Sequence, residues 1–175
     1  MSAFAFCPAC GGALDDPDAD GGARCPRCDR SWYRDPAPTA GCALVEGDRA
    51  LVTVRAREPF KGRFDVPGGF LHVGEHPIDG LKRELKEELG VEIDVTEEDF
   101  LAATPHPYGG ADGDWVLSLG YRGRVVAGEP TPADDVAAIE WVTADELDSL
   151  DFAWPHDREL VRKALSHEPR PPARS

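Results

Sequence analysis

The sequence predicts an α/β domain preceded by a small cysteine-rich segment. Three observations lead to this class. Apolar, strand-like runs separated by turn residues recur from Thr39 onward, an amphipathic helix lies among them, and two Cys-x-x-Cys pairs come before them. A length of 175 residues suits one compact domain with a short appendage, because domains cluster near roughly 100–150 residues.

The cysteine-rich segment has the spacing C-x2-C-x14-C-x2-C, formed by Cys7, Cys10, Cys25 and Cys28. Four thiolates at about this spacing close a tetrahedral zinc site. We expect metal rather than disulfides, because the first residues do not read as a secretory signal. Four cysteines leave no coordination position open. Zn²⁺ is therefore assigned a structural role in a segment too small to build its own core.

These features divide the chain into three parts. We expect a zinc ribbon with its linker over residues 1–36, the α/β domain over residues 37–166 and a disordered tail over residues 167–175. The tail is rich in proline and arginine, a composition that buries too little apolar surface to fold.

Turn residues bound the strands expected in the α/β domain. Gly47 and Asp48 join the first two strands as a hairpin, and Pro67-Gly68-Gly69 interrupts the third. The expected strands are residues 41–46, 50–55, 64–71, 100–104, 114–126 and 139–142.

The clearest helix covers residues 77–89, with a proline in its first turn and Gly90 at the C′ position. Thr143 and Glu146 form a capping-box pattern that predicts a short helix, and residues 155–165 read as the last helix. The clearest helix would be anchored by apolar residues at helical spacing, namely Ile78, Leu81, Leu85 and Leu89.

The same helix carries Glu84, Glu87 and Glu88, whose spacing of i, i+3 and i+4 gathers them on one face. Clustered carboxylates repel one another, and a hard divalent cation such as Mg²⁺ would reverse that repulsion. The alternative is a solvated surface on which Lys82 and Lys86 form ordinary salt bridges with the glutamates.

The segment around these glutamates resembles the Nudix box, G-x5-E-x7-R-E-U-x-E-E-x-G-U. Agreement at every specified position makes a chance match negligible, so the chain is identified as a member of the Nudix hydrolases. The resemblance implies an α/β/α sandwich around a mixed sheet. The matching residues are Gly69, Glu75, Arg83, Glu84, Leu85, Glu87, Glu88, Gly90 and Val91.

The resemblance also implies roles for these residues. Glu75 and Arg83 would brace the loop and orient the metal-binding glutamates. One of those glutamates, or a carboxylate from a later loop, would act as the base. The ligands of the catalytic Mg²⁺ (or Mn²⁺) would be Glu84, Glu87, Glu88 and the carbonyl of Gly69.

Residues outside the box supply further candidates. Family members often place an acidic residue shortly before the strand at residues 139–142, which indicates Asp135, with Asp134 as the alternate and a plain acidic turn as the other interpretation. Arg55 and Arg57 could hold phosphates or be ordinary exposed charges. An aromatic ring facing a base would be Phe64, although a core position is the other interpretation.

The ribbon ahead of a Nudix domain resembles the NADH pyrophosphatase branch of the family. That branch carries a Ser-Gln-Pro-Trp motif after the box, whereas this chain has Thr-Pro-His-Pro-Tyr-Gly-Gly at residues 104–110. Members that favour ADP-ribose often carry a proline beyond the box, which would be Pro107. The resemblance thus implies a substrate similar to ADP-ribose or NADH.

Together these features predict an Mg²⁺-dependent hydrolase that cuts a diphosphate linkage in a nucleoside diphosphate joined to another moiety. The rival is a non-catalytic module that senses nucleotides, or binds RNA or a partner, through the Nudix fold and the ribbon. Because such sensors commonly lose box glutamates, the intact box favours the enzyme.

Composition restricts the partners and the location. A net charge of −14 repels nucleic acid and anionic membranes, which disfavours both and leaves a nucleotide-type small molecule as the ligand. The apolar runs are too short to span a bilayer, so we expect a cytoplasmic protein. Many family members are dimers, so the resemblance also admits a homodimer.

Overall fold

The computed structural model describes residues 5–33, 35–111 and 113–167, and the chain forms two compact units, Met1–Pro36 and Ala37–Ser175. In the first unit, β1 (Ala23–Arg24) and β2 (Ser31–Trp32) pair antiparallel. Most of the tail that the sequence predicts to be disordered, residues 168–175, lies outside the described residues.

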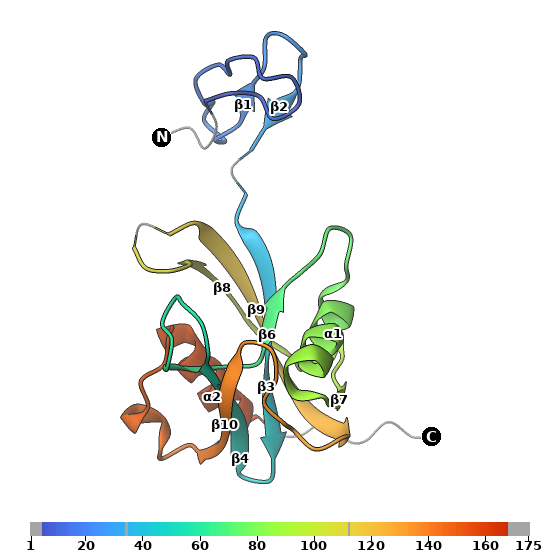
Figure 1. Cartoon of the computed structure of the whole chain (residues 1–175), viewed down its shortest axis with the longest axis vertical. Coiled ribbons are helices and arrows are strands. Elements are labelled where there is room, and N and C mark those ends of the chain that lie inside the picture. Colours follow the sequence, from blue (N-terminus) through green and yellow to red (C-terminus); the bar gives the residue numbers. More distant parts are fainter. Residues whose placement is uncertain (1–4, 34, 112, 168–175) are drawn as a thin grey trace. The chain divides into compact units, whose positions relative to one another are not determined.

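The second unit is built on a mixed sheet with the strand order β10-β4-β3-β9-β7 (Figure 1). The long central strands β3 and β9 run parallel, whereas their other neighbours pair antiparallel. Three shorter pairings widen the sheet, β5 on β4, β6 on β3 and β8 on β9. The strands are β3 (Ala37–Glu46), β4 (Arg49–Arg55), β5 (Phe64–Asp65), β6 (Gly68–Phe70), β7 (Glu92–Asp94), β8 (Phe100–Pro107), β9 (Trp115–Ala127) and β10 (Val136–Thr143).

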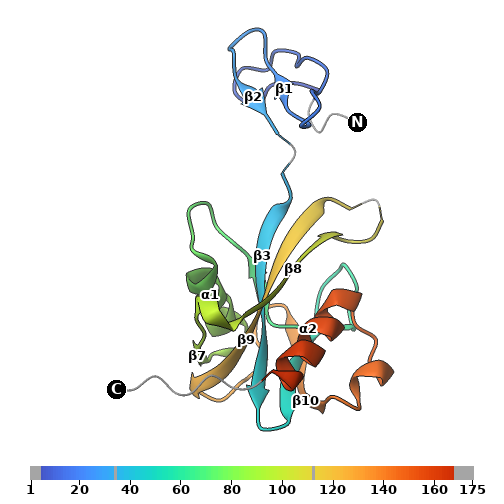
Figure 2. The same cartoon turned by 180° about the vertical axis from the view of Figure 1, so that it is seen from behind.

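Two helices cover opposite faces of this sheet, α1 (Pro77–Leu89) and α2 (Pro155–Ser166), as the two views in Figures 1 and 2 show. Successive side chains of a strand point to opposite faces. Along β3, Cys42 and Leu44 therefore pack into the cluster that includes the leucines of α1, while Ala43 packs into the cluster under α2. The expected α/β/α sandwich is confirmed.

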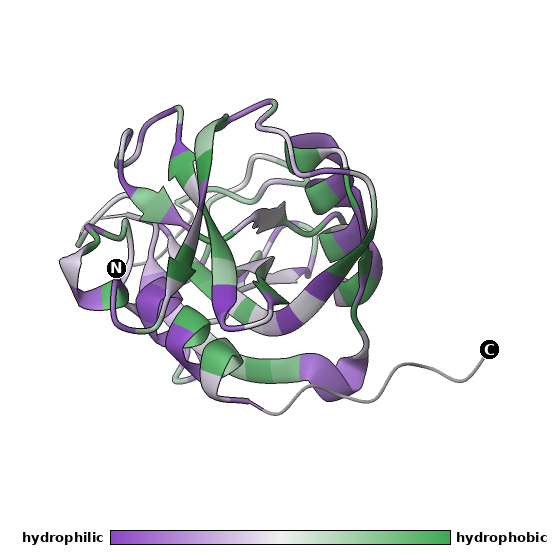
Figure 3. Cartoon of the chain, turned by 90° about the horizontal axis from the view of Figure 1, so that it is seen from below, coloured by the Kyte–Doolittle hydropathy of each residue, from purple (hydrophilic) through white to green (hydrophobic). Residues whose placement is uncertain are grey.

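Each helix turns an apolar side inward and a polar side outward, and the green and purple residues alternate around both helices in Figure 3. The boundaries of α1 are those that the sequence predicts. The side chain of His76 accepts a hydrogen bond from the Ile78 N–H at the first turn, and Gly90 ends the helix with a left-handed φ of 71°.

The structure corrects several expected boundaries. β3 begins at Ala37, four residues before the expected strand at residues 41–46, because its first residues pair with β9. β8 continues to Pro107, because β9 supplies pairing partners as far as Trp115. The helix expected after Thr143 is only a 3₁₀ turn at Leu147–Ser149, although Glu146 does accept the capping hydrogen bonds from Thr143.

Among the described residues, no helix combines the length and apolar character needed to cross a membrane.

Candidate active site

The glutamates of α1 occupy three different environments. Glu88 is buried and its Oε2 accepts a hydrogen bond of 2.9 Å from the N–H of Gly68. Glu84 is partly buried, with its carboxylate against Gly69, while the side chain of Glu87 is 55% exposed. Burial raises the pKa of Glu88 to about 9, despite the Gly68 hydrogen bond, and the negative charges of Asp135 and Glu84 add to the increase.

Arg83 binds the acidic side chains together. Its Nε and Nη2 donate hydrogen bonds of 2.8 and 2.9 Å to the two carboxylate oxygens of Glu75. Its Nη1 donates to Glu84 at 2.7 Å and to Glu87 at 3.3 Å. The hydrogen bonds that Glu75 accepts from Arg83, with another from the N–H of His72, lower the pKa of Glu75 to about 2. The guanidinium therefore fixes the loop before α1 to the helix that carries the glutamates.

Two glycines let strand β6 approach this cluster closely. A Cβ on Gly69 would lie 2.5 Å from Cδ of Glu84, so any larger residue would displace that carboxylate. Gly68 has a φ of 144° and its Cα faces the backbone of β3, a conformation that favours glycine. Gly68 thereby brings its backbone N–H to Glu88 of α1.

The donor set of this region fits a hard divalent cation. Glu84, Glu87 and Glu88 offer carboxylate oxygens, and Gly69 lies against Glu84. Arg83 contacts Glu84 and Glu87, but no described contact joins it to buried Glu88. Buried carboxylates are normally paired or bound to metal, and Mg²⁺ prefers oxygen ligands. These four residues would hold the metal.

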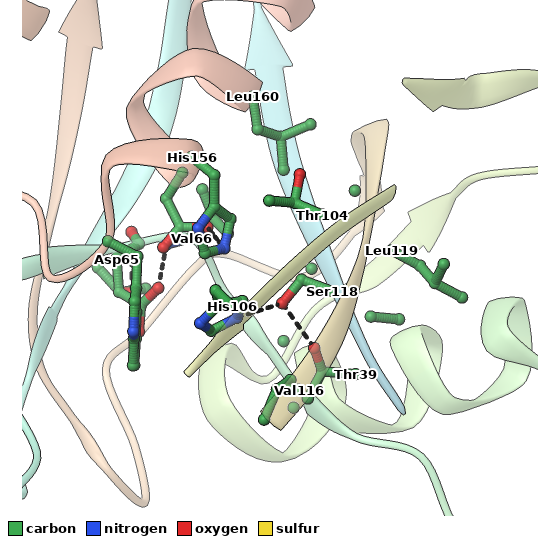
Figure 4. Close-up of a pocket in the computed structure, with 18 of the residues that line it drawn as sticks. Thr39, Asp65, Val66, Thr104, His106, Val116, Ser118, Leu119, His156 and Leu160 are labelled. Atoms are coloured by element: carbon green, nitrogen blue, oxygen red, sulfur yellow. Dashed lines mark hydrogen bonds and ion pairs between the residues drawn. The ribbon is translucent and has the colours of Figure 1, made fainter. Parts of the chain in front are cut away.

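A cavity of about 140 Å³ lies next to Glu88. Gly68, Gly69 and Asp135 line it together with Glu88, and side chains from β8 and α2 complete the lining. Two hydrogen bonds, each 2.9 Å long, connect side chains of its lining (Figure 4). One joins His106 Nε2 and Ser118 Oγ, and the other joins Ser118 Oγ and Thr39 Oγ1.

The other acidic and basic candidates separate into two groups. Asp135 and Arg55 line the cavity, whereas Arg57 does not and instead pairs on the surface with Asp134 at 2.9 Å. The guanidinium of Arg55 is already engaged, because it donates to Asp65 at 2.5 Å and to the carbonyl of Pro59 at 2.8 Å. A phosphate-binding role is therefore less well supported for either arginine than the sequence suggests.

The expectation that Phe64 faces a base is not supported. Its ring packs 6.1 Å from that of Phe152, within the cluster under α2, and it lies outside the cavity lining. Phe64 belongs to β5, which pairs with Val54 of β4, and this pairing directs the ring toward the core.

Sequence analysis missed several residues that line the cavity, namely Asp65, Tyr108, Trp154, His156 and Asp157. The strand expected at residues 100–104 also stopped short of His106, which belongs to β8. The one available signal was the proline at the start of α2. A proline in the first turn indicates that the helix begins there, directly after Trp154. Nothing in the local pattern showed that this turn meets β8.

The cysteines of the first unit form a cluster that could hold a metal ion, with ligand atoms within 4.8 Å of one another. Sγ of Cys7 lies 3.6 Å from that of Cys28, and Sγ of Cys10 lies 3.5 Å from that of Cys25. Tetrahedral zinc with four thiolates requires sulfur atoms about 3.8 Å apart. The indole N–H of Trp32 donates to Cys7 Sγ at 3.2 Å, a contact that suits a thiolate.

Sequence relatives carry several different names. NAD-capped RNA hydrolase NudC of Pseudomonas aeruginosa is 29% identical over 91% of this chain and 54% of its own length. Putative 8-oxo-dGTP diphosphatase 2 of Mycobacterium tuberculosis is 38% identical over 68% of this chain and 81% of its own. ADP-ribose pyrophosphatase of Methanocaldococcus jannaschii is 31% identical over 75% of this chain and 73% of its own length. The chain thus spans about half the length of the NudC relative.

A crystal structure of a NUDIX hydrolase from Nitrosomonas europaea has the same fold, with a TM-score of 0.74, 21% identity and coverage of 93% of this chain and 91% of its own. The model of the NUDIX domain matches residues 35–164. With the box glutamates gathered on α1 and this match over most of its length, the chain belongs to the NUDIX family.

Proposed function

We propose that the protein catalyses Mg²⁺-dependent hydrolysis of a diphosphate linkage in a nucleoside diphosphate joined to another moiety. The observation that carries this proposal is the position of Glu88. It is a buried carboxylate that lines a cavity, on a helix that also carries Glu84 and Glu87. A purely structural surface helix would not bury an acidic residue without a cationic partner.

Glu84, Glu87, Glu88 and the Gly69 carbonyl would hold the metal, which supplies charge neutralisation for the phosphates and lowers the pKa of a bound water. Arg83 and Glu75 keep the carboxylates in position. Asp135, which faces the same end of the cavity, and Glu88 are the two candidates for the base that accepts the proton of the attacking water.

The substrate class is supported by the names of the relatives, which include an ADP-ribose pyrophosphatase and an NAD-capped RNA hydrolase. In both cases the name indicates a diphosphate-containing nucleotide. The acidic composition disfavours nucleic acid in this chain, but the NudC relatives do not support that exclusion. An RNA bearing a nucleotide cap therefore belongs among the candidate substrates, and so does an oxidised nucleoside triphosphate.

For the first unit we propose a structural Zn²⁺ held by Cys7, Cys10, Cys25 and Cys28. The four-sulfur donor set leaves no open position for a substrate. The boundary between this ribbon and the catalytic domain is proposed at residues 36 and 37.

The test is hydrolysis of a panel in the presence of Mg²⁺, with ADP-ribose, NADH, NAD-capped RNA, diadenosine polyphosphates and 8-oxo-dGTP as substrates. Glu87→Gln should lower kcat by roughly 100-fold or more for the substrate that is turned over, because a lost metal ligand removes several kcal/mol of transition-state stabilisation. Lys82→Gln on the same helix serves as the matched control and should leave kcat unchanged.

Absence of turnover for the whole panel, in folded and zinc-loaded protein, would favour the rival function of a nucleotide-sensing or RNA-binding module. Equal kcat values for the wild type and Glu87→Gln would contradict the assignment of the metal site.

A further inference from the structure

One side chain outside the proposed zinc ligands reaches the cysteine cluster of the first unit. The indole N–H of Trp32 donates a hydrogen bond of 3.2 Å to Sγ of Cys7. Within residues 5–33, it is the one side chain that a described hydrogen bond joins, as a donor, to a sulfur of the cluster. The contact indicates a role for Trp32 at the metal site itself.

The backbone of the second cysteine pair positions this indole. Trp32 belongs to β2 and pairs with Ala23 of β1, which directly precedes that cysteine pair. The N–H of Cys25 donates to the carbonyl of Arg30 at 2.8 Å, immediately before β2 begins. Cys7 comes from the first pair, so the hydrogen bond from the indole links the two halves of the ribbon.

The charge of the site explains why such a donor matters. Four thiolates around one Zn²⁺ leave an excess of negative charge, and Cys7 and Cys25 are only 2% and 0% exposed. Buried charge requires hydrogen bonds or a counter-charge. Two arginines close in sequence are engaged elsewhere, because Arg24 binds a carboxylate and Arg27 a backbone carbonyl. The indole N–H is the donor that remains at the sulfur.

We propose that Trp32 is a positioning residue of the zinc site, whose indole N–H fixes Sγ of Cys7 as a thiolate ligand and strengthens the retention of Zn²⁺. An indole nitrogen can only donate, and hydrogen bonds to charged acceptors are stronger than those to neutral ones. Donors behind the ligands of a metal commonly contribute roughly 10- to 100-fold to its affinity. The proposal rests on the zinc site proposed above and is independent of the hydrolysis.

The direct test is NMR of the full chain loaded with ¹¹³Cd in place of Zn²⁺. A hydrogen bond to a ligand sulfur transmits scalar coupling from the metal to the bonded proton. The Nε1 proton of Trp32 should therefore couple to ¹¹³Cd, and Trp32→Phe identifies its signal. The other tryptophans lie in the second unit and should show no coupling, namely Trp115, Trp141 and Trp154.

Trp32→Phe also tests the effect on affinity, because it removes the donor and keeps an aromatic ring. Its affinity for Zn²⁺, measured by competition with a chromophoric chelator, should fall by roughly tenfold or more. Tyr33→Phe is the matched control. This neighbouring residue is 52% exposed, and no described contact joins its hydroxyl to a sulfur, so the affinity should equal that of the wild type.

Alkylation by iodoacetamide separates a lost hydrogen bond from a lost fold. A thiolate that accepts a hydrogen bond is a weaker nucleophile, so zinc-loaded Trp32→Phe should react about tenfold faster at Cys7. The rates at Cys10, Cys25 and Cys28, followed by mass spectrometry, should change by less than about twofold. Equal acceleration at all four cysteines would show that the ring only supports the fold, and would overturn the proposal.

Two other results would also overturn it. One is a loaded wild type without coupling at the Nε1 proton of Trp32, and the other is equal affinity for Zn²⁺ in Trp32→Phe and Tyr33→Phe. A wild type that binds no zinc would instead overturn the zinc site and the role of Trp32 together. Metal content measured before the NMR experiment therefore distinguishes the two failures.

Discussion

The guanidinium of Arg83 connects the acidic side chains of the site. Arg83 donates to Glu75, Glu84 and Glu87, and the side chains of Arg83 and Glu75 are 23% and 16% exposed. Arginine suits this position, because its planar fork can bond several carboxylates at fixed angles, which a lysine ammonium cannot do.

The low pKa of Glu75 leads to a prediction about acid stability. Its pKa falls from 4.5 to about 2 on folding, so its contribution to stability is fully present above about pH 4.5 and is lost as the pH falls toward 2. Glu75→Gln should therefore lower the thermal midpoint at pH 7 and have little effect near pH 2.

Thermal melts followed by circular dichroism across this pH range test that prediction. Glu92→Gln is the control, because this exposed residue makes only a 3.7 Å contact with Lys86. A difference between wild type and Glu75→Gln that stays constant from pH 7 to pH 2 would contradict it.

The adjacent aspartates Asp134 and Asp135 provide a matched pair. Asp135 lines the cavity near Glu88, whereas Asp134 is exposed and bound to Arg57. Asp135→Asn should lower kcat by roughly 100-fold or more, the lower limit of the usual contribution of a general base, and Asp134→Asn should change it by less than about twofold. Steady-state kinetics on the substrate identified in the panel measures both effects. Equal effects of the two substitutions on kcat would contradict the role of Asp135 as the base.

Helix α1, which carries the proposed metal-binding residues, depends on its C-terminal cap. Gly90 has a φ of 71° and its N–H donates to the carbonyl of Lys86. Gly90→Ala should destabilise the second unit by about 1 kcal/mol, because alanine is strained in the left-handed region. Gly90→Asn should lose less, since asparagine tolerates that conformation. Urea unfolding monitors both variants, and equal stabilities for alanine and glycine would refute the role of the cap.

The elements differ in how far the sequence predicted them. α1 was predicted residue for residue, because its apolar stripe, its first-turn proline and Gly90 are local signals. The extent of β8 and the existence of β7 depend on pairing with β9, which is distant in sequence. The box glutamates were predicted from the match to the Nudix box, and they lie on α1 as expected, while their role as metal ligands stays a prediction. Trp154 and Asp157 could not be found, because only the packing of α2 brings them to the cavity.

The chain as a whole forms two compact units, and the cysteine cluster belongs to the first unit. Cys28→Ser should increase amide hydrogen exchange throughout residues 5–33 and leave residues 37–167 protected, because metal binding supplies the folding free energy of so small a unit. Exchange followed by mass spectrometry measures both units in one experiment. Loss of protection in the second unit as well would contradict their independence.

Different parts of the chain line the cavity, because Glu88 comes from α1 whereas His106, Tyr108 and Trp154 come from β8 and the region up to the start of α2. Substitutions in one part can therefore accumulate in a lineage without disturbing the other. Relatives that share the NUDIX fold carry names with different nucleotides, among them ADP-ribose and 8-oxo-dGTP. A substitution at the start of α2 would therefore alter one part of the cavity lining and leave Glu88 on α1 in place.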